Sequence, residues 1–440
     1  MDLAGVAFGL DFQAPLRASA DSEDPPIRGC IYERRAGRPL RLKLAIETAE
    51  FTLAAACCRP PGGARTAAVH ATAAGPVDWR RFERVLTRHR IEGLANAALG
   101  EAGVAGDAAL AGFLASAGRE IAIGGLRLAA ETTRVQSALD KAGVVNLVLK
   151  GATLDALAWG AVGLKRAWDI DLLVEPTEAR RARQVLQGAG YALREPDAPD
   201  DAAFDAWAAL AKECVFVHRT SGLVVELHWR LVDASGLLPG LSARSAAQSV
   251  RLSDTLELRT LAAEPLFAYL CVHGASHAWS RLKWLADLGA LWARGDDAAR
   301  TALYRGACAL GAGNCPATAV LLCERLLGVA PPETIAPKIQ ANSKARSLAA
   351  LAIDAMTHGG GETEIADRPL FQERILLSSF RFADGWRYRW AEWTRQAVSI
   401  DDRLRFPLPA RLAFLYAPMR APLWIWRRIR RRFTRASREM

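Results

Sequence analysis

Two short runs with the character of strands interrupt a chain whose other apolar residues recur mostly at helical spacing. The first run spans residues 144–149 between Gly143 and Gly151, and the second spans residues 169–174 and is closed by Pro176. Short runs of this kind between glycines or prolines are typical of strands buried in a core. The sequence therefore predicts a small sheet within a largely helical protein.

Helical spacing on either side of these runs sets the expected domain organisation. Apolar residues recur every three or four positions up to Leu139, and the pattern returns after about Leu261. Residues 1–40 are rich in Pro, Gly, Asp and Arg without periodicity, so we expect them to be disordered. The fold class is predicted as α+β, a small mixed-sheet domain flanked by N- and C-terminal helical regions. The expected segments are 1–40 disordered, 41–135 N-terminal helical region, 136–235 α/β domain, 236–422 C-terminal helical domain and 423–440 basic tail.

Turn and cap signals add elements to the central domain. A helix is expected over 153–159, and another over 177–187 after Pro176, which suits a first helical turn. The runs 214–218 and 223–229 flank a Thr-Ser-Gly turn and predict a β-hairpin. The central domain is thus expected to alternate strands with helices before it ends in a hairpin.

The composition is that of a folded protein. Of the 440 residues, 51% are hydrophobic and 24% are charged, which is not the balance of a disordered chain. The N-terminus lacks a basic segment followed by an apolar run, and no uninterrupted apolar stretch approaches the ~20 residues that span a bilayer. We therefore expect a cytoplasmic protein. The eight cysteines form no C-x-x-C pair and show no zinc-type spacing, so a structural zinc is not expected.

The positive charge of the chain is concentrated at its end. Residues 420–440 hold eight arginines and one glutamate, which together supply +7 of the formal net charge of +10. The remainder is close to neutral, so nucleic acid is not an expected partner. Trp424 and Trp426 lie among these arginines. The tail is consistent either with peripheral contact to an anionic membrane or with a solvated helix end whose tryptophans pack on the body.

An acidic pair opens the second strand run. Side chains alternate along a strand, so Asp169 and Asp171 project to one side while Ile170 projects to the other. Two adjacent carboxylates repel each other unless a cation lies between them, and oxygen ligands at this spacing suit Mg²⁺ or Mn²⁺. The alternative is a solvated Asp-x-Asp on an edge strand.

The surroundings of this pair favour a metal and phosphate site. Lys150-Gly151 closes the first strand, where a glycine allows the backbone to approach phosphate closely. Arg166 lies just before the acidic pair and suits phosphate oxygens. Glu226 emerges from an otherwise apolar strand, which is costly unless the carboxylate has a partner, and a shared metal would provide one.

These residues carry a resemblance to a known family. The resemblance rests on Leu149-Lys150-Gly151, Arg166-x-x-Asp169-Ile170-Asp171-Leu172-Leu173-Val174, Gly190-Tyr191, Val225-Glu226-Leu227-His228-Trp229, and the segment from His273 to Asp287. Together they resemble the uncharacterised nucleotidyltransferases of bacteria, within the DNA-polymerase-β-like nucleotidyltransferase superfamily. The resemblance extends from about Phe51 to Pro422.

The resemblance implies a reaction and roles for the motif residues. Asp169 and Asp171 would bind Mg²⁺ or Mn²⁺, with Glu226 as the third catalytic carboxylate, and Lys150 and Gly151 would border the triphosphate of a substrate such as ATP. The implied reaction is attack by an unidentified acceptor on the α-phosphorus of the nucleoside triphosphate, with release of pyrophosphate. The chain departs from the superfamily at one point, because Ala152 stands where a serine is usual. Arg166 and Lys165 are expected to neutralise charge on the pyrophosphate.

Several other residues are candidates for supporting or acceptor-binding roles. His273 and His277 are four residues apart on an expected helix and share a face, but no glutamate follows His273 as in a zinc-binding H-E-x-x-H motif. His228 follows Glu226 on the same strand face as a possible base or orienting group, or as a locally bonded histidine. Three further side chains of the helical segment either reach the substrates or form a solvated helix face: Arg281, Lys283 and Asp287.

Two classes of function stay open from the sequence. The complete set of Asp169, Asp171 and Glu226 favours an active nucleotidyltransferase whose acceptor is a small molecule, sugar or protein. Ala152 and the lack of a recognisable acceptor motif favour a catalytically silent nucleotide-binding or interaction module of the same fold. The near-neutral body argues against modification of nucleic-acid ends.

Overall fold

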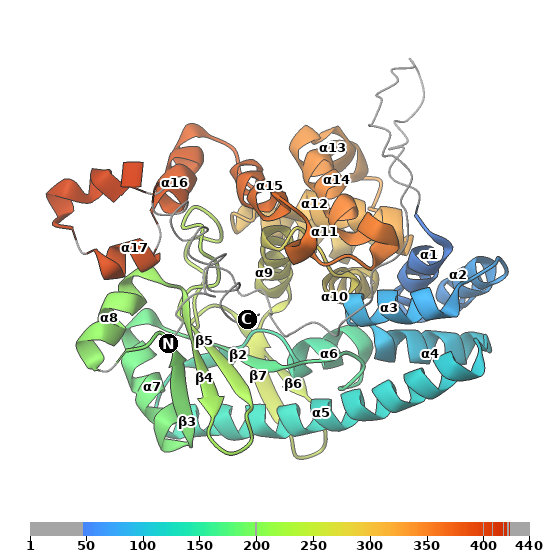
Figure 1. Ribbon diagram of the computed structural model, residues 1–440, viewed down its shortest axis with the longest axis horizontal. Coiled ribbons are helices and arrows are strands. Elements are labelled where there is room, and N and C mark those ends of the chain that lie inside the picture. Colours follow the sequence, from blue (N-terminus) through green and yellow to red (C-terminus); the bar gives the residue numbers. More distant parts are fainter. Residues whose placement is uncertain are drawn as a thin grey trace, which may run out of the picture. The chain divides into compact units, whose positions relative to one another are not determined.

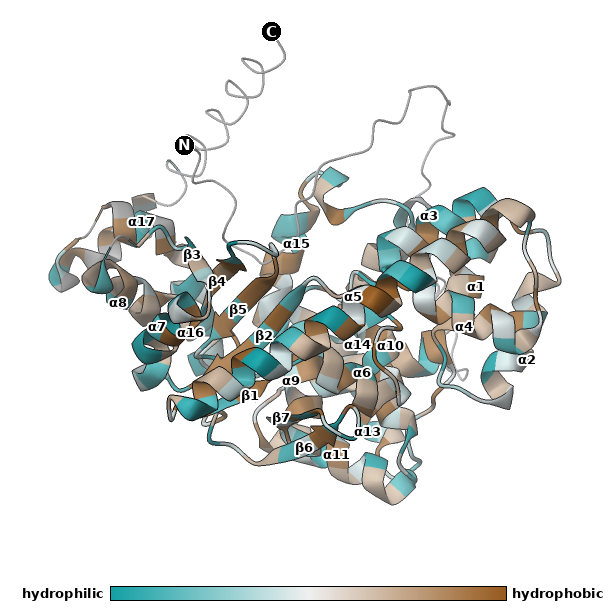
Figure 2. Cartoon of the chain, turned by 90° about the horizontal axis from the view of Figure 1, so that it is seen from below, coloured by the Kyte–Doolittle hydropathy of each residue, from teal (hydrophilic) through white to brown (hydrophobic). Residues whose placement is uncertain are grey.

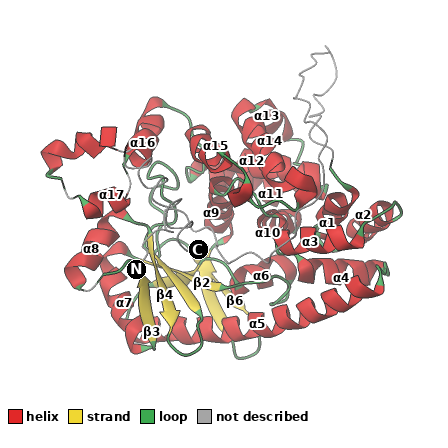
Figure 3. Ribbon diagram, in the orientation of Figure 1, coloured by secondary structure: helices red, strands yellow, loops and turns green. Residues whose placement is uncertain are grey.

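The computed structural model describes residues 47–198, 200–398, 400–406, 408–416, 418, 419 and 422. Within these residues the strands are β1 (Asn146–Val148), β2 (Asp169–Val174), β3 (Tyr191–Glu195), β4 (Glu213–His218), β5 (Val224–His228), β6 (Ala247–Arg251) and β7 (Glu257–Leu261). They form one mixed sheet in the spatial order β3-β4-β5-β2-β1-β7-β6 (Figure 1). Helices make up most of the other described residues (Figure 3), so the predicted α+β class is confirmed.

The centre of the sheet is the parallel pair β2 and β5. On its other side β2 pairs antiparallel with β1, and β5 pairs antiparallel with β4. The β4–β5 pair confirms the predicted hairpin, although β4 begins at Glu213, one residue earlier than expected. Two segments far apart in sequence, residues 169–174 and 224–228, therefore lie side by side.

Strands β6 and β7 fall after residue 235, within the segment assigned from sequence to the C-terminal helical domain. They pair antiparallel with each other, and β7 joins the sheet beside β1. Of the five residues of β6 only Val250 is buried, so the strand shows no apolar alternation that sequence periodicity could detect. The sheet thus extends beyond the segment 136–235.

Helices α5 (Ala108–Lys141) and α7 (Ala179–Gly188) pack on one face of the sheet. Figure 2 shows α5 crossing the sheet. Ile170 and Leu172 of β2 share a buried core with Val135 and Leu139 of α5. Because side chains alternate along β2, this packing directs Asp169 and Asp171 to the opposite face.

The opposite face of the sheet meets α9 (Ala263–Ser276) and α10 (Leu282–Ala293). Leu149 and Leu173 on this face belong to a second core with Phe267 of α9 and Leu285 of α10. The acidic residues of β2 therefore lie on the side of the sheet that faces the C-terminal helices. The remaining longer helices are α1 (Ala49–Cys57), α2 (Gly63–Ala73), α3 (Trp79–His89), α4 (Glu92–Ala102), α6 (Ala152–Trp159), α8 (Asp201–Leu210), α11 (Asp297–Ala309), α12 (Cys315–Leu322), α13 (Ala336–Ala341), α14 (Ser343–Thr357), α15 (Phe371–Ser378), α16 (Trp386–Ala397) and α17 (Ile400–Arg405).

The helices expected in the central domain are confirmed with small shifts. Helix α6 covers the predicted 153–159, and the predicted 177–187 consists of a short 3-10 turn, Pro176–Glu178, followed by α7. Strand β3 and helix α8 lie between α7 and the hairpin and were not predicted. The expected disorder of residues 1–40 and the basic tail at 423–440 both lie outside the described residues.

Helix α5 is long and apolar enough, by length and composition, to cross a membrane. Its most apolar stretch is 22% buried within the protein. The same helix contributes Leu128, Val135 and Leu139 to the core beneath the sheet, as a core helix of a folded domain does. Ile123 and Leu126 are exposed on its other side.

Candidate functional site

The acidic pair of β2 stands on the sheet face that looks toward α9 and α10. Asp171 is buried, with 3% of its surface exposed, and Asp169 at the beginning of the strand is partly exposed. Ile170 between them lies in the core on the other face. The local alternation expected from sequence is therefore present, and it sets the two carboxylates on one side of the strand.

Strand β5 brings a third carboxylate to this face. In the parallel register of β2 and β5, Asp171 lies beside Glu226 and Asp169 beside Val224. Val225 and Leu227 point to the opposite face and are fully buried there. Glu226 therefore stands next to Asp171 through backbone pairing between strands more than fifty residues apart in sequence.

The end of β1 supplies a cation. Lys150 Nζ lies 3.0 Å from Asp171 Oδ1, and the Leu149 amide donates a hydrogen bond to the Asp171 carbonyl at 3.0 Å. The next residue, Gly151, has a φ of +68° and precedes the first turn of α6. A side chain at this position would be strained, so the glycine permits the sharp turn from Lys150 into the helix.

His228 joins two acidic residues behind the carboxylates. Its Nε2 lies 3.2 Å from Asp171 Oδ1, and its Nδ1 lies 2.8 Å from Glu213 Oε2. Glu213 in turn pairs with Lys212. The chain of contacts runs from Lys150 through Asp171, His228 and Glu213 to Lys212, so charges alternate along it.

Lys212 and Glu213 were not identified from the sequence. Glu213 is the first residue of β4 and lies opposite His228 in the antiparallel register with β5. The predicted hairpin began one residue later, at Cys214. Extending the β4–β5 pairing by one position would have placed Glu213 across from His228, and this is the signal in the sequence that could have found it.

The carboxylates of β2 differ in their protonation behaviour. Burial, together with the neighbouring Asp171 and Glu226, raises the pKa of Asp169 to about 7. Burial also acts to raise the pKa of Asp171, but Lys150 and His228 outweigh it and hold that pKa well below its usual range. The repulsion among the clustered carboxylates therefore raises the proton affinity of Asp169, while Asp171 stays ionised.

The pKa of His228 is shifted by the same network. Burial acts to lower this pKa, but the charge of Glu213 and contacts with Asp171 and Glu226 raise it well above its ordinary value. The imidazole is therefore held as a cation between carboxylates, with Nε2 hydrogen-bonded to Asp171 and Nδ1 in an ion pair with Glu213.

Helices α9 and α10 contribute aromatic and basic side chains on the facing side. The rings of His273 and His277 lie 4.7 Å apart between centroids, and His277 lies 5.0 Å from Trp284. Burial and Lys150 lower the pKa of both histidines, that of His277 to about 3. The histidines are neutral in this environment.

Lys283 is a third lysine near the carboxylates. Burial and the positive charge of Arg90 lower the pKa of its ammonium to about 7, while the charge of Asp169 acts in the opposite direction. Lys150, Lys212 and Lys283 come from three separate elements. Each interacts electrostatically with the acidic cluster: with Asp171, Glu213 and Asp169, respectively.

Other residues singled out from sequence have contacts of their own. Lys165 is buried between the carboxylates of Asp155 and Asp287, 2.9 Å from Asp287 Oδ1, and Asp287 also accepts a hydrogen bond from Trp159 Nε1 at 2.8 Å. This buried ion cluster joins α6, the loop before β2 and α10.

The two arginines singled out from the sequence pair with glutamates. Arg166 lies 3.7 Å from Glu92 and 3.4 Å from Glu120, on α4 and α5. Arg281 lies 3.0 Å from Glu364 and donates to the Arg88 carbonyl.

One group of potential metal ligands is found among the described residues. Ligand atoms of Asp171, Glu226 and His228 all lie within 4.8 Å of one another. Asp169 lies on the same face two residues earlier along β2 and adds a third carboxylate to the neighbourhood. Clustered carboxylates at a strand end are a suitable donor set for a hard divalent cation.

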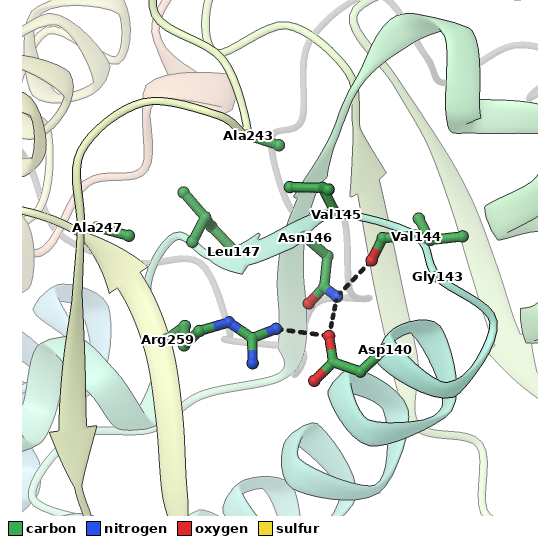
Figure 4. Close-up of a pocket in the computed structure, with 9 residues that line it drawn as sticks. All are labelled: Asp140, Gly143, Val144, Val145, Asn146, Leu147, Ala243, Ala247 and Arg259. Atoms are coloured by element: carbon green, nitrogen blue, oxygen red, sulfur yellow. Dashed lines mark hydrogen bonds and ion pairs between the residues drawn. The ribbon is translucent and has the colours of Figure 1, made fainter.

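A separate pocket lies at the far end of β1 (Figure 4). It is lined by the 143–147 segment, Ala243, Ala247, Arg259 and Asp140. Its polar side chains already pair with one another: Asn146 Nδ2 donates to Asp140 Oδ1 at 2.8 Å, and Arg259 lies 2.5 Å from the same oxygen. The polar side chains of this pocket are therefore engaged with one another, so we place the candidate site at the acidic cluster.

Comparison with known proteins identifies one family. A family model described as an uncharacterised nucleotidyltransferase matches residues 75–328, more than half of the chain. The matched segment includes the acidic cluster, its lysines, and helices α9 and α10. No curated protein and no solved structure matches the chain.

Proposed function

Because the chain belongs to the family of uncharacterised nucleotidyltransferases, we propose that it moves a nucleoside monophosphate from a nucleoside triphosphate to a hydroxyl-bearing acceptor. The acceptor is a small molecule, a sugar or a protein, and pyrophosphate is the second product. The observation that carries this proposal is the register of β2 and β5, which sets Glu226 beside Asp171 on the face that also bears Asp169.

The donor set fits a divalent cation such as Mg²⁺ or Mn²⁺. Burial and two neighbouring carboxylates raise the pKa of Asp169, which indicates negative charge that the protein's own lysines do not fully balance. Asp169, Asp171 and Glu226 would hold the metal. The metal, when bound, would offset the charge of the triphosphate and of the developing oxyanion.

The lysines of the site suit the phosphates of the donor. Lys150 stands at the turn where Gly151 exposes the backbone beside the first turn of α6, which favours close approach of a phosphate. Lys212, immediately before β4, and Lys283 of α10 add further positive charge. Ala152 removes the hydroxyl usual at this turn in the wider superfamily, so the backbone and the lysines carry the phosphate contacts.

The transfer itself forms one bond and breaks one. The acceptor hydroxyl oxygen forms a bond to the α-phosphorus, and the bond from that phosphorus to the oxygen bridging to the β-phosphate breaks. Glu226 is partly exposed and is the group we assign to accept the hydroxyl proton. His228 keeps Asp171 ionised by contact with its carboxylate.

A screen with radiolabelled triphosphates tests this function. The full chain is incubated with each of the four nucleoside triphosphates, Mg²⁺ or Mn²⁺, and cell extract as the acceptor source. We expect transfer of label that is lost in Asp169→Asn and in Asp171→Asn and kept in Asp254→Asn, which removes an exposed carboxylate elsewhere. Label transfer that persists in both β2 variants would refute the assignment of the site.

A catalytically silent nucleotide-binding module is the second candidate. The observation that favours it is the pairing of Asp171 with Lys150 and His228, which balances that carboxylate without a metal. Under this alternative, triphosphate binds but label is not transferred with any acceptor. Equilibrium binding of nucleotide without turnover in the same screen would support it.

The site of action is the cytoplasm in our proposal, with the basic tail at 423–440 as a peripheral membrane contact. The eight arginines of residues 420–440 are the basis for this contact. Recovery of the protein with anionic vesicles that falls when the tail is removed would support it.

A further inference from the structure

The outward side of α16 is aromatic. Trp386, Trp390 and Trp393 are 72%, 61% and 47% exposed, and their spacing of four and three residues sets them on one side of the helix. Tyr388 and Glu392, on the opposite side, are buried. We term the three tryptophans the tryptophan face. A helix that packs on a folded body normally turns its polar side toward solvent, whereas α16 turns its tryptophan face toward solvent.

Contacts on the inner side fix the orientation of the helix. Tyr388 Oη donates to the Ser379 carbonyl at 2.8 Å, and Gln396 Nε2 donates to the Leu376 carbonyl at 2.9 Å. Glu392 accepts from Ser379 Oγ and from Arg395. Because these bonds tie one side of α16 to α15 and the turn after it, the helix cannot rotate to bury its tryptophans.

Exposed apolar side chains are concentrated in this part of the protein. Of the eleven exposed large hydrophobic side chains among the described residues, eight lie between residues 370 and 412. Besides the tryptophan face, they come from α15, α17 and the adjoining segments: Leu370, Leu377, Leu404, Phe406 and Leu412. Large apolar groups left in water mark surfaces that meet a partner.

Positive charge accompanies the tryptophan face. Arg387 and Arg389 are exposed and lie on either side of it around the helix. The sequence that follows is strongly basic, with eight arginines and one glutamate in residues 420–440. We propose that the tryptophan face of α16 docks into the interface of an anionic lipid bilayer, with Arg387 and Arg389 contacting lipid phosphates.

The chemistry of the surface favours lipid over other partners. Tryptophan is amphipathic and is enriched at the boundary between headgroups and acyl chains. Trp390 and Trp393 stack on each other with centroids 5.2 Å apart. Each indole thus covers one ring face of the other, which reduces the ring area on which a nucleobase could stack. A second copy of the chain would bring the same arginines together, and their repulsion opposes such a dimer.

Vesicle binding by the full chain tests the proposal independently of any catalysis. Vesicles of phosphatidylcholine alone are compared with vesicles that also contain phosphatidylglycerol, at physiological salt. We expect binding to the anionic vesicles and a fall of at least about tenfold in partitioning for the triple variant Trp386→Ser, Trp390→Ser, Trp393→Ser. Tryptophan emission is expected to shift to the blue on binding in the parent and to shift less in the variant.

Matched variants distinguish binding through the tryptophan face from binding through the basic tail and from binding through any exposed apolar residue. Arg387→Gln with Arg389→Gln is expected to weaken binding to anionic vesicles and to reduce its salt dependence. Ile123→Ser with Leu126→Ser changes two apolar residues of α5 whose exposure, 52% and 64%, lies within the range of the three tryptophans. This variant is expected to bind as the parent does. Removal of residues 423–440 is expected to leave the difference between the parent and the triple variant in place.

Three outcomes would overturn the proposal. The first is equal vesicle binding by the parent and by a triple variant whose circular dichroism shows that it is folded. The second is a change in oligomeric state on size-exclusion chromatography in the triple variant, which would identify a second copy as the partner. The third is binding of an oligonucleotide that displaces the parent from vesicles and that is lost in the triple variant. If the triple variant does not fold, Trp386→Ser alone, at the most exposed position, must lower binding in the same direction.

Discussion

Asp171 is the residue on which the charges of the candidate site converge. Its carboxylate meets Lys150 from the end of β1 and His228 from β5, and it lies beside Glu226 in the strand register. These contacts keep Asp171 ionised although it is buried, while the neighbouring Asp169 has a pKa of about 7. Two aspartates separated by one residue therefore present different affinities for a proton, because only one of them has a cation in contact.

Gly274 of α9 supports the turn that leads into α10. A Cβ at this position would lie 2.4 Å from atoms of the Trp279 ring, which is fully buried. We expect Gly274→Ala to lower the free energy of unfolding by about 1–3 kcal/mol, because a buried indole cannot move aside without strain. Denaturant titration of the parent and the variant gives the comparison.

A glycine with open space provides the control. Gly124 in α5 has nothing within 4 Å of the position of its Cβ, so Gly124→Ala is expected to raise stability by roughly 0.5–1 kcal/mol through its better helix propensity. If both alanine variants changed stability in the same direction, close packing of Trp279 against Gly274 would not be the cause.

Helix α10 connects the candidate site with the structural core. Its first turn carries Lys283 toward Asp169, and one turn later Asp287 enters the buried ion cluster with Lys165 and Asp155. The N-terminus of α10 is held by His89 of α3, whose Nδ1 accepts a hydrogen bond from the Leu282 amide at 3.0 Å. The position of Lys283 therefore depends on contacts with elements from distant parts of the chain.

Removal of Lys165 from the buried ion cluster is expected to be costly. Lys165→Met leaves the carboxylates of Asp155 and Asp287 buried without their shared cation, and we expect a loss of roughly 3–5 kcal/mol in unfolding free energy. The measurement is chemical denaturation at neutral pH. Combining Lys165→Met with Asp155→Asn and Asp287→Asn should recover part of the loss, because no uncompensated charge is then buried. If Lys165→Met alone were as stable as the parent, Lys165 would not be the cation that balances Asp155 and Asp287.

His89 gives the protein a defined pH dependence of stability. Burial and the nearby Arg88 hold the pKa of His89 well below its ordinary value of 6.5. Below that pH the unfolded chain binds a proton that the folded protein excludes, so stability is complete above it and falls as pH decreases. The expected slope from this residue is about 1.4 kcal/mol per pH unit.

Comparison with His89→Gln isolates this contribution. The variant is expected to be less stable than the parent at neutral pH and to lose stability less steeply on acidification below about pH 6.5. Unfolding free energies measured across this range supply the slopes. Parallel slopes for the two proteins would show that His89 is protonated in the folded state.

At the scale of the whole molecule, one sheet separates two environments. On one face α5 and α7 bury the apolar residues of β2 and β5. On the other, the acidic residues of the same strands meet basic and aromatic side chains carried by α9 and α10. The site thus depends on a core beneath it and on a separate layer of helices above it.

Ligand binding across these layers is expected to stabilise the folded protein. A ligand that binds only the native state adds stability by mass action, about 2.7 kcal/mol at a concentration one hundredfold above its Kd. We therefore expect ATP with Mn²⁺ to raise the Tm more than either component alone. Thermal unfolding of the parent and of Asp171→Asn checks this.

In Asp171→Asn the additional rise from the metal is expected to disappear, because one of its ligands loses its charge. Asp254→Asn should keep the full rise. An equal metal-dependent rise in Asp171→Asn and the parent would place the metal elsewhere on the protein.

Local sequence determined the features that depend only on neighbouring residues. The period of two along a strand was sufficient to place Asp169 and Asp171 on one face, and turn chemistry was sufficient to predict the hairpin that carries Glu226. The glycine after Lys150 likewise marked the end of the first strand run. These inferences succeed because backbone geometry within a strand or turn does not depend on the rest of the fold.

Tertiary structure alone decided which groups meet. The sequence does not show that β5 lies beside β2, that Glu213 contacts His228, or that Lys165 is buried with Asp155 and Asp287 away from solvent. Nor does it reveal that α16 turns three tryptophans outward, because helical spacing shows that residues share a face but not whether that face is buried. Neighbours across a sheet and the burial of a helix face are set by the packing of distant segments. That packing depends on the apolar area and the charges that the segments bury against one another, which a local sequence pattern does not contain.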